Sequence, residues 1–335
     1  MKTTQSYLTL AVVLILALAR FALGQQPAEK APIPAAAAQA EAAKVIKEVY
    51  GDEWTAAKAA TEKQALAKKL LGKASESKDD PASQFVLLRA ARDIAAQASD
   101  RQAAFLAIDA MAETFQLNVL EMKLGVLTKL SSAAESPRQH NSISEEALAL
   151  LDQALGRDDF AIADQLGKLA LDEAQKADEK GFITQAQTRI AEVAELAKAY
   201  EDVKAAKVTL QKTPDNPDAN TVVGNYLCFV KGDWDRGLPM LSLGKDDALK
   251  AQAIQELQGA ALSAEQAKLG DGWWSLAEKQ EGIAKKQLQG RAGYWYQKAL
   301  PGLSGLMKDK VKKRMEGLAS VRPTNDSGAV FTAVS

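Results

Sequence analysis

Alanine is the feature that most restricts how this chain can fold. Of the 335 residues, 63 are alanine, whereas only 10 are proline and 21 are glycine. Alanine is the strongest helix former and is depleted in strands. The sequence also contains no run of alternating β-branched residues. The composition therefore predicts an all-α chain and argues against a β-sandwich or a doubly wound sheet.

The charge balance excludes one broad class of partners. There are 42 basic and 43 acidic side chains, which gives a formal net charge of -1. General binding to nucleic acid phosphates or to anionic lipid requires a marked basic excess. We therefore expect no nucleic acid partner.

The first 24 residues have the parts of a secretory signal peptide. Lys2 precedes an apolar run over residues 7–19, and Ala22-Leu23-Gly24 follows, with small residues one and three positions before a possible cleavage site. This run is shorter than the roughly 20 residues that a membrane-spanning helix needs. We therefore expect cleavage after Gly24, an exported periplasmic or secreted protein, and no membrane span in the mature chain. The alternative is an uncleaved N-terminal membrane anchor, which Arg20 near the end of the run favours.

The remaining chain reads as one long helical region between two irregular segments. Residues 25–34 contain three prolines without a sustained apolar pattern, which predicts a flexible linker. Helix signals then recur, and they predict a helical-repeat domain over residues 35–320. Residues 321–335 are expected to form an irregular tail.

Apolar spacing and capping residues predict the first helices. Two helices are expected over residues 35–50 and 54–71, with Trp54 on the inward face of the second. Asp80 followed by Pro81 is a helix start signal, because Asp caps a helix and Pro suits its first position. Short connections between successive amphipathic helices indicate antiparallel hairpins.

Further along, two pairs of residues have the spacing of a capping box. Ser142 with Glu145 predicts one helix start, and Ser263 with Gln266 predicts another. Residues 181–212 form a long stretch without a break, and periodicity leaves open whether it is one helix or two.

The single Cys and the single His suggest no chemistry. Cys228 has no partner for a disulfide, and its apolar neighbours predict a buried, inert side chain. His140 lies in the polar sequence SPRQHNS and is expected to be a solvated loop residue. We expect neither a Cys/His catalytic pair nor a metal site.

Carboxylates near the Trp-rich segments could in principle act as a glycosidase pair, Asp233 and Asp271 among them. Acidic residues at helix starts, however, are expected as caps. The chain also lacks a P-loop, an HExxH motif, a GxSxG motif and a dinucleotide fingerprint. We therefore expect a protein that is not an enzyme and that needs no cofactor.

Small and large residues alternate at helical spacing in the C-terminal third. Trp234, Gly237 and Leu241 illustrate one instance, and Ala292 with Tyr296 another. Small residues let neighbouring helices approach while a large side chain fills the adjacent gap. Trp234, Gly237 and Tyr296 are therefore expected to pack in the core.

This region resembles tetratricopeptide repeats, which pair a helix bearing a Trp-x-x-Leu-Gly pattern with a helix bearing Ala-x-x-x-aromatic. The matching residues are Trp273-x-x-Leu276-Ala277 and Ala292-x-x-x-Tyr296, followed by Pro301. The clearest units span about residues 216–305, although the interval from Trp273 to Ala292 is longer than usual. The same segments look like those of exported, uncharacterised bacterial proteins that carry this helical module. The resemblance implies an α-solenoid of stacked antiparallel hairpins.

Aromatic residues concentrate near the C-terminal end of this region. Trp273 and Trp274 are adjacent, as are Tyr294 and Trp295. Adjacent helical residues point about 100° apart, so both members of a pair cannot enter the same core. These four residues are the candidate contacts for a ligand or partner. We expect an exported protein that mediates protein–protein interaction in the cell envelope; the alternatives are a glycan-binding module that uses these rings, and a structural envelope protein.

Overall fold

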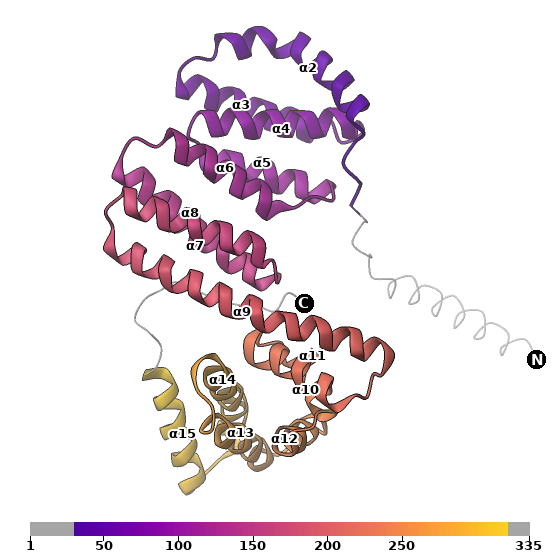
Figure 1. Ribbon diagram of the computed structural model, residues 1–335, viewed down its shortest axis with the longest axis vertical. Coiled ribbons are helices and arrows are strands. Elements are labelled where there is room, and N and C mark those ends of the chain that lie inside the picture. The colour runs from indigo at the N-terminus through magenta and orange to yellow at the C-terminus, as the bar shows by residue number, and fades with distance from the viewer. Residues whose placement is uncertain (1–29, 321–335) are drawn as a thin grey trace, which may run out of the picture. The chain divides into compact units, whose positions relative to one another are not determined.

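The computed structural model describes residues 30–320 (Figure 1). Within this range every regular element is helical and no strand is formed, which confirms the all-α prediction. The expected signal peptide over residues 1–24 and the expected tail over residues 321–335 lie outside the described residues.

The described chain divides into two compact units, where the sequence suggested one domain. Unit 1 comprises the chain up to Leu150 together with Lys168–Thr184. Unit 2 comprises Leu151–Gly167 together with the chain from Gln185 onward. Helices α7, α8 and α9 each contribute residues to both units, so the helix boundaries do not coincide with the unit boundaries.

Unit 1 is built from hairpins in layers (Figure 1). Helices α3 and α4 pack together, as do α5 and α6, and further contacts join α3 to α5 and α4 to α6. Helix α2 packs on α3 and α4. The helices that contribute to this unit are α2 (Ala36–Ala56), α3 (Ala60–Glu76), α4 (Pro81–Gln97), α5 (Arg101–Thr114), α6 (Val119–Ala133), α7 (Pro137–Gly156) and α8 (Phe160–Lys176).

Capping residues set several of these helix starts, as expected. The Asp80 carboxylate accepts a hydrogen bond from the Ser83 backbone N–H at 3.1 Å, and Pro81 is the first residue of α4. Asp100 caps α5 in the same way, through the Ala103 backbone N–H at 2.9 Å. The inward face predicted for α4 is confirmed, since Phe85, Leu88, Ala91, Ile94 and Ala95 are all buried.

The boundary between the first two helices differs from the expectation. Trp54 belongs to α2, and α3 begins only at Ala60. The physical reason is the cap that fixes α3: the Glu62 carboxylate accepts from the backbone N–H groups of Lys58 (2.8 Å) and Ala59 (2.9 Å). Trp54 consequently has no place on the inward face of α3, and it is 38% exposed.

The start of α7 was also misplaced. Ser142 and Glu145 lie inside α7 and form no cap, because the helix begins at Pro137. Ser136 and Gln139 supply the capping box instead. The Gln139 side chain accepts from the Ser136 backbone N–H at 3.0 Å, and the Ser136 hydroxyl accepts from the Gln139 backbone N–H at 3.4 Å.

Part of the expected flexible linker is fixed in unit 1. The Ala31 N–H donates to the Thr114 carbonyl, and the Gln116 N–H donates to the Ala31 carbonyl, both at 2.8 Å. Ala31 thereby forms a bridge beside Phe115, whose side chain is completely buried. Residues from 30 onward are therefore held against the end of α5.

Unit 2 contains most of the longest helix of the described chain and a series of shorter ones. Residues 181–212 form a single helix, since α9 runs from Lys180 to Lys212. The subsequent elements are α10 (Pro217–Asn225), a π-helix (Tyr226–Val230), α11 (Trp234–Ser242), α12 (Asp247–Leu257), α13 (Ser263–Ala277), α14 (Gly282–Ala299), a 3₁₀ turn (Leu300–Gly302) and α15 (Gly305–Ser320).

Two helix starts in unit 2 test the capping expectations. Asn216 caps α10 through the Ala219 backbone N–H at 2.9 Å, as its position before Pro217 predicts. The box expected at Ser263 and Gln266 is displaced by one residue. The Glu265 carboxylate accepts from the Leu262 backbone N–H at 3.2 Å, so the cap position is Leu262.

Several glycines allow close contacts between elements of unit 2, Gly237 and Gly270 among them. A Cβ atom at Gly237 would lie 2.3 Å from the Cys228 sulfur, and one at Gly270 would lie 2.5 Å from the Tyr296 ring. Trp234, Gly237 and Tyr296 are buried, which confirms their predicted packing role. Cys228 is buried too, and burial raises the pKa of its thiol, as expected for an inert side chain.

Between residues 30 and 320, no helix is both long enough and apolar enough to cross a bilayer.

Candidate functional site

A groove lies between α2 and α4 in unit 1. Its volume is about 380 Å³. Ala43, Ile46 and Trp54 of α2 and Val86 and Ala90 of α4 form its apolar walls. Most of these side chains are small, so two packed helices leave space between them that no side chain fills.

A second cavity of about 230 Å³ adjoins the groove, since Trp54 lines both. Ala57, Leu66 and Ile94 form its apolar part. Trp54 therefore borders both hollows while 38% of the residue stays exposed. We call the two cavities together the Trp54 groove.

Charged side chains surround the apolar walls of the Trp54 groove. Lys47, Arg89 and Asp93 line the larger cavity, and Lys58 and Lys63 line the smaller one. Such a combination of apolar walls with a few polar groups is typical of binding pockets. Sequence reasoning missed this site, because Trp54 was assigned to the core face of α3. The available signal was a lone Trp near the end of an alanine-rich segment.

The aromatic cluster of unit 2 differs from the expectation at two of its four candidate residues. Trp273 is completely buried and Trp295 is 7% exposed. Neither ring offers a surface to a ligand in this conformation, so both are corrected to packing residues. The reason is that α13 and α14 pack closely, and Trp273 and Trp295 lie on the packed faces. Tyr294 is 40% exposed and Trp274 is partly buried.

Trp273 is held by a buried ion pair. The Glu256 carboxylate accepts from the Trp273 indole N–H at 2.5 Å and from Arg291 Nε at 2.7 Å. The Arg291 guanidinium also lies 5.2 Å from the Trp234 ring centroid. This network joins α11, α12, α13 and α14, and its polar groups satisfy one another. Its arrangement is that of a structural core.

Cations cover the two aromatic residues that keep exposed surface. Arg291 and Lys298 lie 4.5 Å and 4.4 Å from the Tyr294 ring centroid. Arg314 lies 5.0 Å from the Trp274 ring centroid, and the Trp274 indole N–H donates to Glu278 at 2.9 Å. A sugar ring stacks on an open aromatic face. The cations thus compete for the surface that a glycan would use.

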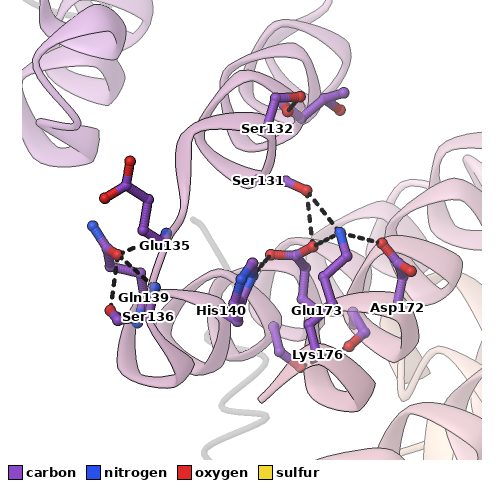
Figure 2. A network of polar contacts seen from close by, with 12 residues as sticks. Ser131, Ser132, Glu135, Ser136, Gln139, His140, Asp172, Glu173 and Lys176 are labelled. Carbon is purple, nitrogen blue, oxygen red and sulfur yellow. Dashed lines mark hydrogen bonds and ion pairs between the residues drawn. The ribbon is translucent and has the colours of Figure 1, made fainter.

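A buried carboxylate in unit 1 gathers polar groups from three helices (Figure 2). Glu173 of α8 is completely buried. Its carboxylate contacts His140 Nδ1 of α7 at 2.9 Å, accepts from the Ser131 hydroxyl of α6 at 2.8 Å, and accepts from Lys176 Nζ at 2.7 Å. Burial raises the pKa of the Glu173 carboxyl, but these hydrogen bonds together hold that pKa below its ordinary value.

His140 is therefore not the solvated loop residue that its polar neighbours suggested. It lies in the first turn of α7, and its side chain is 14% exposed. The early start of α7 at Pro137 explains the correction, because it turns a loop into a helix whose face meets Glu173. Sequence reasoning could not pair residues 33 positions apart.

The chemical types Ser, His and Glu also occur in catalytic triads, but this geometry differs from a triad. In a triad the His lies between the nucleophilic hydroxyl and the acid. Here the Ser131 hydroxyl and the His140 ring both bond to Glu173 itself (Figure 2). The acid is also shielded from solvent. The network fits the task of joining α6, α7 and α8.

Metal binding and similarity to known proteins complete the description. Among residues 30–320, no group of three or more His, Cys, Asp and Glu side chains is placed to hold a metal ion. Comparison of the chain with protein-family models, curated proteins and solved structures gave no match.

Proposed function

We propose that this chain is an exported, non-enzymatic helical-repeat protein that binds a protein partner in the cell envelope through the Trp54 groove. Export is supported by the signal-peptide pattern of residues 1–24. The stacked hairpins of unit 1 and the α13–α14 hairpin of unit 2 support a tetratricopeptide-like architecture. Repeat proteins of this kind present extended binding surfaces.

The observation that carries the proposal is the partly exposed Trp54 ring between two cavities. Trp is the residue type most enriched at binding hot spots, because a ring that fills a desolvated interface contributes a large apolar area. In the free chain Trp54 is 38% exposed. A side chain of a partner that entered the groove would bury this remaining surface.

The proposal is tested by site-specific photocrosslinking in the cells that produce the chain. A photoreactive amino acid replaces Lys47, which is exposed at the groove, or Lys68, an exposed residue of α3 that does not line it. We expect a discrete protein adduct from position 47 and none from position 68. The crosslinked protein is then identified by mass spectrometry, purified and titrated against the chain. Its affinity should fall in Trp54→Ala.

Glycan binding through Tyr294 is the second candidate, and its support is the exposed fraction of that ring. A polysaccharide array run with the same protein, and with Tyr294→Ala, separates the two candidates. Binding that Tyr294→Ala abolishes, without any adduct at position 47, would favour the glycan module. Absence of both a protein adduct and a retained glycan would favour a structural role in the envelope.

A further inference from the structure

The charges around the Trp54 groove are unbalanced. Lys47, Lys58, Lys63 and Arg89 line the two cavities, and within residues 30–320 none of these four cations forms an ion pair with a carboxylate. Arg89 donates to the neutral Gln39 side chain at 2.7 Å. The cations are thus available to a charged ligand.

The acidic groups near the groove are already engaged. Asp93, the one carboxylate in the lining, pairs with Arg92 at 2.9 Å and with Lys129 at 3.1 Å. Glu62 caps α3 through two backbone N–H groups, and those bonds lower the pKa of its carboxyl. Glu53 pairs with Lys69 at 2.6 Å. The groove therefore has a positive rim around apolar walls.

The remaining acidic residues of α2 are Glu41, Glu48 and Asp52, of which Glu41 pairs with Lys44 at 2.7 Å. With 100° between successive helical residues, Asp52 lies about 140° from Lys47 around the helix axis. Glu48 lies about 100° from Lys47 by the same estimate. Neither residue lines either cavity. They leave the positive character of the groove face unchanged.

From this arrangement we infer that the groove recognises an acidic amphipathic polypeptide segment, with an apolar side chain packed beside Trp54 and carboxylates paired with the surrounding Lys and Arg residues. The inference rests on the proposed function and specifies the chemistry of the partner. An apolar anchor matches the walls, and opposite charge at the rim gives orientation and a faster encounter. A segment rich in Lys or Arg would meet four like charges.

The test uses three synthetic peptides of equal length with the same helical pattern of Leu and Phe. Their flanking positions carry Glu, Gln or Lys. Fluorescence anisotropy of each labelled peptide, titrated with the purified chain at low salt, gives the affinities. We expect the Glu peptide to bind at least about tenfold more tightly than the Lys peptide, since several rim charges attract the first and repel the second. The preference should shrink as salt rises.

Charge reversal provides the matched controls. In the double variant Lys47→Glu, Lys63→Glu, the Glu peptide should lose about tenfold in affinity and the Lys peptide should gain. Lys68→Glu adds the same kind of charge to α3 outside the cavities, and it should leave both affinities unchanged. Circular dichroism confirms that each variant folds. Equal affinities for the three peptides, or a double variant that keeps the original order, would overturn the inference.

The same purified proteins and peptides distinguish two other possible occupants of the groove. If the chain alone forms a dimer that the double variant dissociates, as seen by sedimentation, the groove binds a second copy and the inference is wrong. Dodecanoate tests the other occupant. If it displaces the Glu peptide and binds at least as tightly as every peptide, the groove is a site for a small anionic amphiphile. That result too would overturn it.

Failure of the inference and failure of the proposed function give different results. Suppose that a partner crosslinked at position 47 binds the double variant as tightly as the original chain. The proposed function would then stand, and the inference that the partner segment is acidic would be rejected. No adduct at position 47, together with no binding of any peptide, would remove both.

Discussion

Trp273 of unit 2 and Trp54 of unit 1 occupy opposite environments. Trp273 is completely buried, and its indole N–H bonds to Glu256, which also holds Arg291. Trp54 is 38% exposed between two cavities and is paired with no carboxylate among residues 30–320. The comparison teaches that a dense group of aromatic residues marks packing here, whereas a lone Trp beside small residues marks an open surface.

The largest expected effect comes from removing the buried ring. Trp273→Ala should lower the free energy of unfolding by about 3–5 kcal/mol, because it leaves a cavity in the core of unit 2. The change also takes one donor away from the buried Glu256 carboxylate. Urea denaturation followed by circular dichroism measures the loss. A midpoint equal to that of the unchanged chain would contradict the core role assigned to Trp273.

Replacing one glycine in each unit by alanine tests the same difference in packing. Gly270→Ala should cost about 1–3 kcal/mol, because the added Cβ would lie 2.5 Å from the buried Tyr296 ring. Gly72→Ala in α3 has nothing within 4 Å of the added atom, so it should stabilise by about 0.4–1 kcal/mol. The same chemical substitution thus has opposite signs. Thermal melts of both variants, compared with the unchanged chain, measure the difference; two shifts of the same sign would refute it.

These differences also explain how far the sequence could predict the structure. Caps such as Asp80 before Pro81 depend on residues next to each other, and they were located correctly. The start of α7 was wrong because SPRQ and SISE both have capping spacing, and the cap forms at Ser136 and Gln139. Burial of His140 depends on Glu173, 33 residues away. Local sequence patterns therefore predict helices, whereas the spacing of residues does not predict contacts between side chains far apart in the sequence.

The candidate site was harder to predict than the helices for a related reason. An aromatic side chain looks the same in a sequence whether it fills a core or borders a groove. Trp273 and Trp295 carried the repeat-like pattern and proved buried. The exposure of Trp54 follows from where α2 ends and from the cap on α3 by Glu62. That depends on a competition between two possible helix boundaries, which apolar periodicity does not resolve.

The polar core of unit 1 gives a pH-dependent prediction. The pKa of the Glu173 carboxyl is lower in the folded chain than its ordinary value. The ionised carboxylate therefore stabilises the fold fully at pH values above the ordinary pKa. The stabilisation is lost as pH falls through the lowered pKa. Glu173→Gln should therefore cost about 1–3 kcal/mol near pH 7, because the charge-assisted hydrogen bonds are weakened.

The matched measurement follows stability from pH 7 down to about pH 3, a range that spans the ordinary carboxyl pKa. The difference between the unchanged chain and Glu173→Gln should narrow as the pH falls. Glu145→Gln is the control, since this exposed residue of α7 makes no hydrogen bond or ion pair with Ser131, His140, Glu173 or Lys176. A difference that stays constant over the whole range would mean that Glu173 does not titrate with folding.

The smallest expected effect on stability comes from the exposed ring. Trp54→Ala should cost about 1 kcal/mol, since the ring borders cavities and has fewer neighbours to lose than a core residue. Its effect on binding should be far larger, because the ring provides the apolar contact for the partner. Val49→Ala is the control, as Val49 is 61% exposed on the same helix and lines neither cavity. Trp54 is assigned to binding if its replacement abolishes peptide affinity while the urea midpoint hardly moves, and Val49→Ala changes neither. A large loss of stability with retained affinity would instead place Trp54 with Trp273 as a packing residue, and the distinction between the two regions would disappear.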